Sequence, residues 1–304
     1  MTSNDFGNAT VGFVGIGNMG WPMASCVAAA GNKVTVFDLD AERVKTFAKE
    51  KGVGGASNAR EVAAASEVIV TMLPTSAAVE HALSGSTGIL DGLRKGSVLL
   101  EMSSGVPTET RKFSELVMKR GAILVDAPVS GGVARAKTGE LAIMAGGDSA
   151  MLDRLEPLLR KMGSSILRTG GVGSAHAMKA LNNLVSAGGF LIGIEALLIG
   201  KRFGLDPNLM VDVLNASTGM NNSTQRKFKQ FVLSRKFNSG FGLDLMVKDL
   251  SIALDVGKQT SAATPFAALC RELCAAAAGM LGPGQDHTAV AKLSERLAGI
   301  ELTE

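Results

Sequence analysis

The chain has 304 residues, of which 46% are hydrophobic and 19% are charged, and its formal net charge is +3. This composition is that of an ordinary globular protein long enough for two domains, and the small charge without a Lys/Arg run argues against a nucleic-acid partner. The first ten residues are polar and lack an apolar core, so we expect no signal peptide. Three cysteines suggest a reducing compartment rather than a disulfide framework, and we expect a cytoplasmic protein.

The scarce residue types limit the proton chemistry. There is no tyrosine, which excludes a dehydrogenase mechanism that uses a Tyr proton donor. The histidines are His81, His176 and His287, and none stands at a zinc-like spacing from Cys, Asp or Glu, so we expect no metal site. Proton transfer must therefore fall to a lysine, a histidine or a carboxylate.

A dinucleotide-binding pattern opens the chain. A short apolar strand is predicted at residues 10–15, and it runs into the glycine loop Gly15-Ile16-Gly17-Asn18-Met19-Gly20. A helix over 21–30, a strand over 33–37 and the acid Asp38 follow. The glycines permit a tight turn and let the backbone approach a pyrophosphate, which then faces the start of the helix. A glycine turn without a ligand fits this complete pattern less well.

Asp38 decides our cofactor prediction. It comes 18 residues after Gly20, a position suited to accept hydrogen bonds from the adenosine ribose. A carboxylate there repels a 2′-phosphate, so we expect NAD rather than NADP.

Further apolar strands alternate with helical or looped segments, at residues 67–73, 97–102, 122–126 and 141–145. This pattern predicts a doubly wound, mostly parallel α/β sheet, in which ligands bind beyond the carboxyl ends of the strands. We therefore expect one crevice to be lined by the residues that follow these strands, among them Leu73, Pro74, Ser104, Ser130, Gly131 and Gly132. The last three offer a hydroxyl and backbone N–H groups for a carboxylate, although taken alone they would read as a plain turn.

The second part of the chain has a different character. After Arg168 the strand signals fade and Ala/Leu-rich segments with helical spacing follow. We predict a Rossmann domain at residues 1–170 and an all-helical domain at 171–304, joined by a long helix. A membrane span over 180–200 is an alternative that the polar residues of this window disfavour, namely Asn182, Asn183, Ser186 and Glu195.

Lys179 stands alone at the head of this apolar segment, because no charged residue occurs between Ala180 and Ile194. Asn183 lies four residues later on the same helical face. A lysine held among apolar neighbours is disfavoured in its charged form, which suits it to proton transfer. The alternative is a lysine whose ammonium snorkels to water.

Together these segments resemble the β-hydroxyacid dehydrogenase family, which contains 3-hydroxyisobutyrate dehydrogenase and, more distantly, 6-phosphogluconate dehydrogenase. The resemblance spans residues 11–295 and rests on four motifs in order: Gly12–Gly20, Asp126–Gly132, Gly173–Asn183 and Lys248-Asp249-Leu250. Two departures occur: Ala175 replaces the second glycine of the third motif, and Ala78 stands where some members carry a polar cofactor contact. We expect Ala175 to narrow the entrance to the helix.

The resemblance implies a role for each matching residue. Lys179 would be the catalytic acid/base and Asn183 would position the substrate. The substrate carboxylate would bind Ser130, Gly131 and Gly132. Cofactor contacts would come from the glycine loop, Leu73, Pro74 and Ser104, and Lys248 would serve the substrate and the nicotinamide side of the site.

We therefore predict hydride transfer between NAD and a small β-hydroxy acid, such as 3-hydroxyisobutyrate, or the matching semialdehyde. The alternatives are a semialdehyde or imine reductase of the same fold and a nucleotide-binding protein without turnover. His176 is the competing proton donor and ranks behind Lys179, because no carboxylate partner is evident for it. Val133, Phe241 and Asp244 are guesses for the side-chain pocket. The Ala/Leu-rich domain predicts a homodimer or homotetramer, with no membrane partner.

Overall fold

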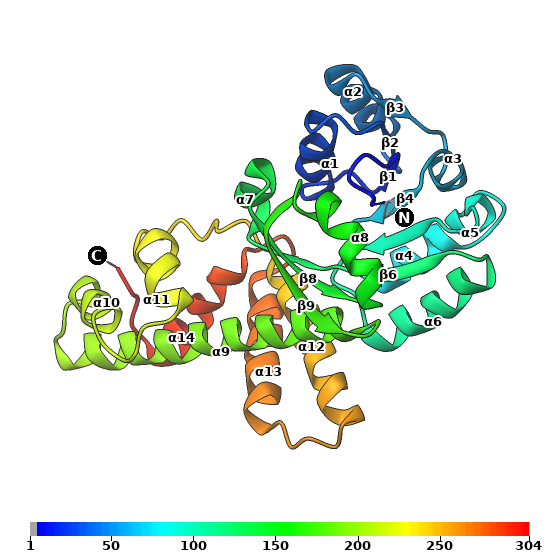
Figure 1. Cartoon of the computed structure of the whole chain (residues 1–304). Helices are drawn as coiled ribbons and strands as arrows, with labels where there is room; N and C mark the ends of the chain where they lie inside the picture. The colour runs from blue at the N-terminus through cyan, green and yellow to red at the C-terminus, as the bar shows by residue number, and fades with distance from the viewer. Residues whose placement is uncertain (1–4, 304) are drawn as a thin grey trace. The chain divides into compact units, whose positions relative to one another are not determined.

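The computed structural model describes residues 5–303 (Figure 1). The chain divides into two compact units, residues 1–179 and 180–304. The helix α9 (Ser174–Phe203) has 30 residues, begins in the first unit and continues into the second.

The first unit contains one sheet, which has nine strands in the described part of the chain. These are β1 (Val11–Val14), β2 (Val34–Phe37), β3 (Gly54–Gly55), β4 (Val68–Thr71), β5 (Val98–Glu101), β6 (Ile123–Asp126), β7 (Val129–Ser130), β8 (Leu141–Gly146) and β9 (Gly163–Gly170). Their order is β3-β2-β1-β4-β5-β6-β8-β7, and β9 pairs with β8. From β3 to β6 all neighbours are parallel, with Phe13 opposite Val36 on one side and Val70 on the other.

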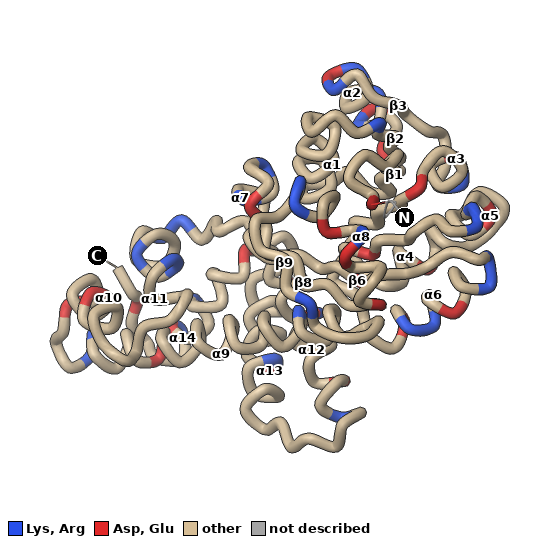
Figure 2. The backbone as a smooth tube through the Cα atoms, viewed as in Figure 1, with Lys and Arg blue, Asp and Glu red and all other residues tan. Residues whose placement is uncertain are grey.

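Helices connect these strands and cover both faces of the sheet (Figure 1). They are α1 (Gly20–Ala29), α2 (Ala41–Lys51), α3 (Ala59–Ala65), α4 (Ser76–Leu83), α5 (Ile89–Gly92), α6 (Pro107–Lys119), α7 (Gly132–Thr138) and α8 (Ser149–Leu159). Several begin at a residue whose side chain accepts a backbone N–H of the first turn, as Asp40 does for α2 and Asp148 for α8. Lys and Arg are interspersed with Asp and Glu along α2 and α6 (Figure 2), so these outer helix faces are mixed in sign.

The sheet core explains why the central strands are apolar throughout. Successive side chains of a strand point to opposite faces, so a sheet covered on both sides buries every position. Phe13 packs with α1 and α8 on one face, whereas its neighbour Val14 packs with α3 and α6 on the other. All four residues of β1, β4 and β5 are buried.

The second unit is helical in its described residues, apart from one isolated bridge between Gly242 and Asp286. After α9 come α10 (Pro207–Asn215), α11 (Asn222–Arg226), the π-helix η1 (Phe228–Leu233), α12 (Leu243–Gln259), α13 (Pro265–Leu281), the 3₁₀ helix η2 (His287–Val290) and α14 (Ala291–Ala298). Phe190, Ile194 and Phe228 lie in its core. The predicted fold class, a Rossmann sheet followed by a helical domain and joined by a long helix, is confirmed.

Three strands of the sheet escaped the sequence analysis, and one has a different direction from the expected one. β3 and β7 have two residues each, and β9 is an edge strand with mostly exposed, polar residues, so none gives an apolar signal. β8 runs antiparallel to β6 and β7. A parallel pair needs a long crossover, whereas only β7 and the seven-residue α7 separate β6 from β8.

The apolar character of α9 has two explanations. By length and composition it could cross a membrane, with a mean hydropathy of 1.7 over its most apolar 18 residues, yet 56% of that window is buried inside the protein. A core helix of a globular protein has the same composition, and α9 packs Phe190, Ile194 and Leu197 into the core of the second unit.

Candidate active site

In the glycine loop between β1 and α1, two glycines stand where a side chain would clash with the backbone, and the remaining one has free space where its side chain would be. Gly15 has φ +93°, and a Cβ there would lie 2.5 Å from Met72 O. A Cβ on Gly20 would lie 2.1 Å from Gly15 O. Gly17, in contrast, has no atom within 4 Å of where a Cβ would be. The first and third glycines therefore serve chain packing, and the second leaves the backbone open to a ligand.

The start of α1 completes this part of the site. The helix has no side-chain cap at its N-terminus, so no side chain competes with a ligand for the N–H groups of its first turn. A helix start of this kind with an open glycine before it suits a pyrophosphate. The residues present thus fit a dinucleotide, as the sequence predicts.

Asp38 lies at the end of β2 and is held by three donors. Its carboxylate accepts hydrogen bonds from Ile16 N (2.9 Å), Asp40 N (3.0 Å) and Arg43 Nη1 (3.2 Å). The bond to Ile16 ties the acid to the glycine loop, at the strand end where dinucleotide-binding sheets carry the acid that contacts the ribose. Arg43 was not singled out from the sequence, and its guanidinium forms an ion pair with Asp38.

The turns that follow β4 and β5 are joined through a buried serine. Leu73 N donates to Ser103 Oγ (2.9 Å), and Ser103 N donates to Glu101 Oε1 (2.9 Å). β4 and β5 are parallel neighbours, so Leu73-Pro74 and Ser104 follow adjacent strands at one edge of the sheet. The structure thus places these predicted residues at the expected edge.

The segment Ser130-Gly131-Gly132 links β7 to α7. Gly131 and Gly132 are exposed and have φ values of +132° and +67°, which side-chain-bearing residues rarely adopt. Ser130 is partly buried at the end of β7. Exposed backbone N–H groups beside a hydroxyl, at the start of a helix, fit the predicted carboxylate site.

The head of α9 is fixed by Asp126, the last residue of β6. Its buried carboxylate accepts the N–H groups of Gly173 (2.8 Å), Ala175 (2.9 Å) and His176 (3.0 Å). These bonds satisfy helix-start donors that would otherwise lack partners. Ala175 is fully buried, and its backbone is not in the left-handed region, so the methyl group is absorbed within this capped turn.

His176 has the carboxylate partner that the sequence analysis failed to find. Its Nε2 lies 2.8 Å from Glu101 Oε2 and 3.0 Å from Ser103 O, and its Nδ1 lies 2.7 Å from Thr110 Oγ1. The expectation that His176 lacks a carboxylate partner was therefore wrong. Glu101 belongs to β5 and reaches His176 only through the fold, so no local signal reveals the pair.

The partners of His176 define its protonation state. The Glu101 carboxylate and the Ser103 carbonyl can only accept, so Nε2 of His176 donates a hydrogen bond. The Thr110 hydroxyl already donates to Val106 O (3.0 Å), so Nδ1 donates to the Thr110 oxygen. Both ring nitrogens therefore carry a proton. Burial lowers the pKa of His176, but the charges of Glu101 and Asp126 outweigh it and raise this pKa above its ordinary value. The pKa of Glu101 is lowered, because the charge of the His176 imidazolium outweighs the effect of burial, which alone would raise this pKa. A buried ion pair thus braces the head of α9.

Lys179 lies on α9 just beyond this braced turn and is buried, with 8% of its surface exposed. Asn183 follows one helical turn later and is also buried. In the second unit, Asn183 Nδ2 donates to Asp249 Oδ2 (2.6 Å), and Asp249 Oδ1 lies 3.3 Å from Lys248 Nζ. One buried carboxylate therefore orients both the predicted amide and the predicted lysine of α12.

Asp249 is a buried residue whose pairing with Asn183 the sequence did not reveal. An adjacent Lys-Asp pair on a helix usually lies on a solvated face. Asp249 is instead 1% exposed. Its neighbours Leu250, Ile252 and Ala253 are buried too, and this apolar spacing was the available signal.

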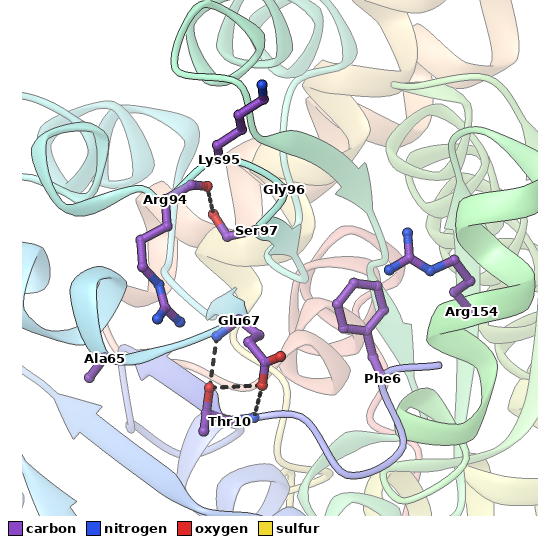
Figure 3. Close-up of a pocket in the computed structure, with 9 residues that line it drawn as sticks. All are labelled: Phe6, Thr10, Ala65, Glu67, Arg94, Lys95, Gly96, Ser97 and Arg154. Carbon is purple, nitrogen blue, oxygen red and sulfur yellow. Dashed lines mark hydrogen bonds between the residues drawn. The ribbon is translucent and has the colours of Figure 1, made fainter. Parts of the chain in front are cut away.

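A cavity of about 410 Å³ lies elsewhere in the first unit (Figure 3). Its lining includes Thr10 and Glu67, whose carboxylate accepts hydrogen bonds from Thr10 N and Oγ1. These residues precede β1 and β4, so the cavity is at the amino ends of the strands, opposite the edge that binds ligands in such sheets. Among residues 5–303, no group of three or more His, Cys, Asp or Glu side chains is placed to hold a metal ion.

Two family models match successive parts of the chain. Residues 10–171 match the NAD-binding domain of 6-phosphogluconate dehydrogenase, and residues 173–294 match the NAD-binding domain of NADP-dependent 3-hydroxyisobutyrate dehydrogenase. The chain belongs to the β-hydroxyacid dehydrogenase family. This β-hydroxyacid dehydrogenase is an oxidoreductase with a nicotinamide-nucleotide-binding domain, as the sequence predicts.

Individual relatives cover nearly the whole of this β-hydroxyacid dehydrogenase. It is 34% identical to 2-(hydroxymethyl)glutarate dehydrogenase of Eubacterium barkeri, over 96% of this chain and 97% of the relative. It is 38% identical to the mitochondrial 3-hydroxyisobutyrate dehydrogenase of Mus musculus, over 84% and 77% of the two chains. The solved 3-hydroxyisobutyrate dehydrogenase of Mycobacterium tuberculosis with L-serine is 31% identical, with a TM-score of 0.86 over 94% of this chain and 99% of that one.

Proposed function

We propose that this enzyme interconverts a small β-hydroxy acid and its semialdehyde with NAD as cofactor and Lys179 as general acid/base. The observation that carries the proposal is the setting of Lys179 on α9. It is buried, it follows a helix start that Asp126 fixes through three N–H groups, and it lies one turn before an asparagine whose amide is oriented by Asp249.

In the proposed oxidation, Lys179 removes the proton from the substrate hydroxyl, and in the reverse direction it returns that proton to the aldehyde oxygen. When bound, the nicotinamide accepts or supplies the hydride at the carbinol carbon. Ser130 and the N–H groups of Gly131 and Gly132 hold the substrate carboxylate. Asn183 and Lys248, both positioned by Asp249, orient the reacting groups.

His176 is set aside as the proton donor on geometric grounds. Its side chain is completely buried, and both ring nitrogens are engaged by Glu101, Ser103 and Thr110. A group whose protons are committed to internal partners cannot exchange them with a substrate. Its role is to hold the helix that carries Lys179.

The NAD preference rests on Asp38, which is tied to the glycine loop and suited to accept ribose hydroxyls. Because Arg43 balances that carboxylate, we expect the preference over NADP to be moderate. Asp38→Ala should shift the ratio of kcat/KM values toward NADP, and Arg43→Ala should shift it toward NAD.

The relatives suggest which reacting unit the substrate carries. 3-Hydroxyisobutyrate and 2-(hydroxymethyl)glutarate, the compounds that the relatives' names contain, both have a hydroxymethyl group on the carbon beside a carboxylate. They differ in the third substituent, which is a methyl group in the first and a carboxyethyl group in the second. We propose a substrate with this shared unit.

The direct test is NADH or NADPH absorbance with a panel of β-hydroxy acids, with NAD and NADP assayed in parallel. We expect turnover with at least one acid that carries the hydroxymethyl–carboxylate unit, and faster turnover with NAD. Tight NAD binding without turnover of any acid would instead indicate a catalytically silent nucleotide-binding protein. Faster reaction of imines than of semialdehydes would favour an imine reductase.

We also propose a homodimer or homotetramer located in the cytoplasm. An apolar row on α9, consisting of Val185, Ile192, Ile199 and Phe203, is between 54% and 84% exposed, which suits contact with a second copy. The free cysteines Cys26, Cys270 and Cys274 suit a reducing compartment. Light scattering that gives a monomer mass would refute the oligomer.

A further inference from the structure

Lys227 is a cation that the proposed chemistry does not use, and the local fold places it against α9. Asn221 begins α11 with a capping box: its side chain accepts Ser223 N (2.7 Å) and Thr224 N (3.2 Å), and Thr224 Oγ1 accepts Asn221 N (2.9 Å). The helix ends at Lys227, where η1 begins. Short π-helical segments of this kind occur often at functional sites.

The contacts of the Lys227 ammonium are a hydroxyl and an aromatic ring. Nζ donates to Ser186 Oγ at 3.0 Å and lies 5.9 Å from the centroid of Phe190. Within the described chain no carboxylate lies within ion-pair distance of this ammonium. An ammonium has three donors, so this one has the capacity to bind an anion.

The carboxylate whose charge Lys227 does feel, Asp286, is committed elsewhere. It accepts hydrogen bonds from Ser239 Oγ (2.9 Å), Gly240 N (2.8 Å) and Thr288 N (2.9 Å), and it caps η2. Burial lowers the pKa of Lys227 to about 8, and Asp286 offsets this only in part. Residues 5–303 therefore provide this partly buried cation with no ion-pair partner, which is costly unless a ligand supplies one.

His287 lies beside the same ring but contributes neither a charge nor a free donor to an anion site. Its centroid lies 6.0 Å from that of Phe190, and its side chain is 7% exposed. Nδ1 donates to Phe241 O (3.2 Å), which leaves Nε2 as an acceptor, and this buried atom has no hydrogen-bond partner among the described residues. Burial and the charge of Lys227 lower the pKa of His287 to about 4, so the ring is neutral at pH 7.

The spacing along α9 relates this cluster to the proposed reaction. Lys179, Asn183, Ser186 and Phe190 are separated by four, three and four residues, so they lie on one face of the helix. With a rise of 1.5 Å per residue, Ser186 lies about 10 Å along the axis from Lys179. An anion bound by Ser186 and Lys227 would therefore lie further along the helix than the group that reacts at Lys179, which suits the far end of a longer substrate.

We propose that Lys227 and Ser186 bind a second carboxylate, so that the preferred substrate is a hydroxy diacid rather than a hydroxy monoacid. This inference rests on the proposed function, because it assumes that Lys179 marks the reacting end. The diacid 2-(hydroxymethyl)glutarate and the monoacid 3-hydroxyisobutyrate form a matched pair of probes, since they share the reacting unit and differ in the group that would reach Lys227.

The test compares kcat/KM for these two acids with NAD in wild type, Lys227→Gln and Lys229→Gln. We expect wild type to prefer the diacid, and Lys227→Gln to lower the diacid-to-monoacid ratio by about 10–100-fold, the effect of losing a charged hydrogen bond. Lys229 is the control, because it is two residues away and already paired with Asp212 at 2.6 Å, so Lys229→Gln should leave the ratio unchanged. An unchanged ratio in Lys227→Gln, or a wild type that prefers the monoacid, overturns the inference.

Glutarate separates this inference from the proposed function, because it has two carboxylates but no hydroxyl to oxidise. We expect calorimetry to show that glutarate binds the NAD-loaded wild type and binds Lys227→Gln at least tenfold more weakly. If neither acid is oxidised but this difference holds, the anion site stands and the proposed function fails. If wild type does not bind glutarate, the anion site is refuted whatever the turnover.

Discussion

Two regions contact α9 with buried or partly buried charged side chains, and they differ in whether those charges have partners within the protein. At its head, in the sheet unit, Glu101 and Asp126 surround His176, and every charge is matched by an internal partner. Further along, in the helical unit, the Lys227 ammonium contacts a hydroxyl and a ring of the same helix, and no carboxylate of the described residues lies within ion-pair distance of it. The difference indicates that the first cluster serves the fold and the second serves a ligand, since a buried charge without an internal partner lowers stability.

The largest expected effect on stability comes from Asp126→Ala. This change removes the acceptor of three N–H groups at the start of α9 and one of the charges that stabilise the His176 imidazolium. We expect a loss of about 3–5 kcal/mol in the free energy of unfolding, measured by chemical denaturation. Asp148→Ala is the control, because Asp148 caps α8 through one N–H, and about 1 kcal/mol is expected there. Equal losses in the two variants would contradict a special role for Asp126.

Glu101→Gln should cost about 2–3 kcal/mol at pH 7, because it leaves the buried imidazolium without its carboxylate. The raised pKa of His176 gives stability that is complete below its ordinary value of 6.5 and is lost as the pH rises through the raised value. The lowered pKa of Glu101 gives stability that is complete above 4.5 and is lost as the pH falls through the lowered value.

The difference between wild type and Glu101→Gln should therefore be greatest between these limits and shrink in both acid and alkali. Denaturation curves across this pH range measure it. Glu109→Gln removes an exposed pair with Lys112 and should change stability by less than about 0.5 kcal/mol. A difference that does not vary with pH would show that the pair is not ionised.

Asp249→Ala tests whether the helical unit positions the reacting groups. Without this carboxylate, Asn183 loses the acceptor of its amide and Lys248 loses its ion pair. We expect kcat to fall about 10–100-fold, the effect of a small misplacement of catalytic groups, with nucleotide affinity retained. Asp255→Ala, on the exposed side of the same helix, should leave kcat unchanged. A wild-type kcat in Asp249→Ala would remove Asp249 from the mechanism.

The smallest expected effect on stability is a gain rather than a loss in the free energy of unfolding. Lys227→Met should raise the free energy of unfolding by about 1 kcal/mol at pH 7, because an apolar group replaces a partly buried cation. Since the pKa of Lys227 is lowered from 10.5 to about 8, the charge opposes folding below pH 8, and the wild-type deficit should disappear as the pH rises from 8 to 10.5. Lys229→Met should stay within about 0.5 kcal/mol of wild type. A loss of stability in Lys227→Met would place this lysine with the structural charges of the first region.

Local patterns could predict one part of this molecule. The glycine loop, Asp38 and the strands β1, β4 and β5 depend on residues close together in sequence, and their apolar runs follow from burial on both faces of the sheet. The motif order also indicated the family. β7 and β9 could not be predicted in this way, because a two-residue strand has no period and an exposed edge strand has no apolar signal.

Polar residues that pair across long stretches of the chain could not be predicted from the sequence either. His176 and Glu101 meet only when β5 and the head of α9 come together, and Ser186 meets Lys227 only when α11 packs on α9. Asp249 directly follows a lysine, a pattern usual on solvated helix faces, whereas the fold buries it against Asn183. Tertiary contacts of this kind determine what a charged residue does, and local sequence does not contain them.

The most direct test of the account is the turnover of Lys179→Ala with the best hydroxy acid and NAD. We predict that kcat falls by about 10²–10⁴-fold, the span of general acid–base catalysis, while NAD affinity stays close to that of wild type. Lys201→Ala, later on the same helix, where Lys201 contacts Thr303, should keep full turnover. Near-wild-type turnover in Lys179→Ala would contradict the assignment of Lys179 as the acid/base.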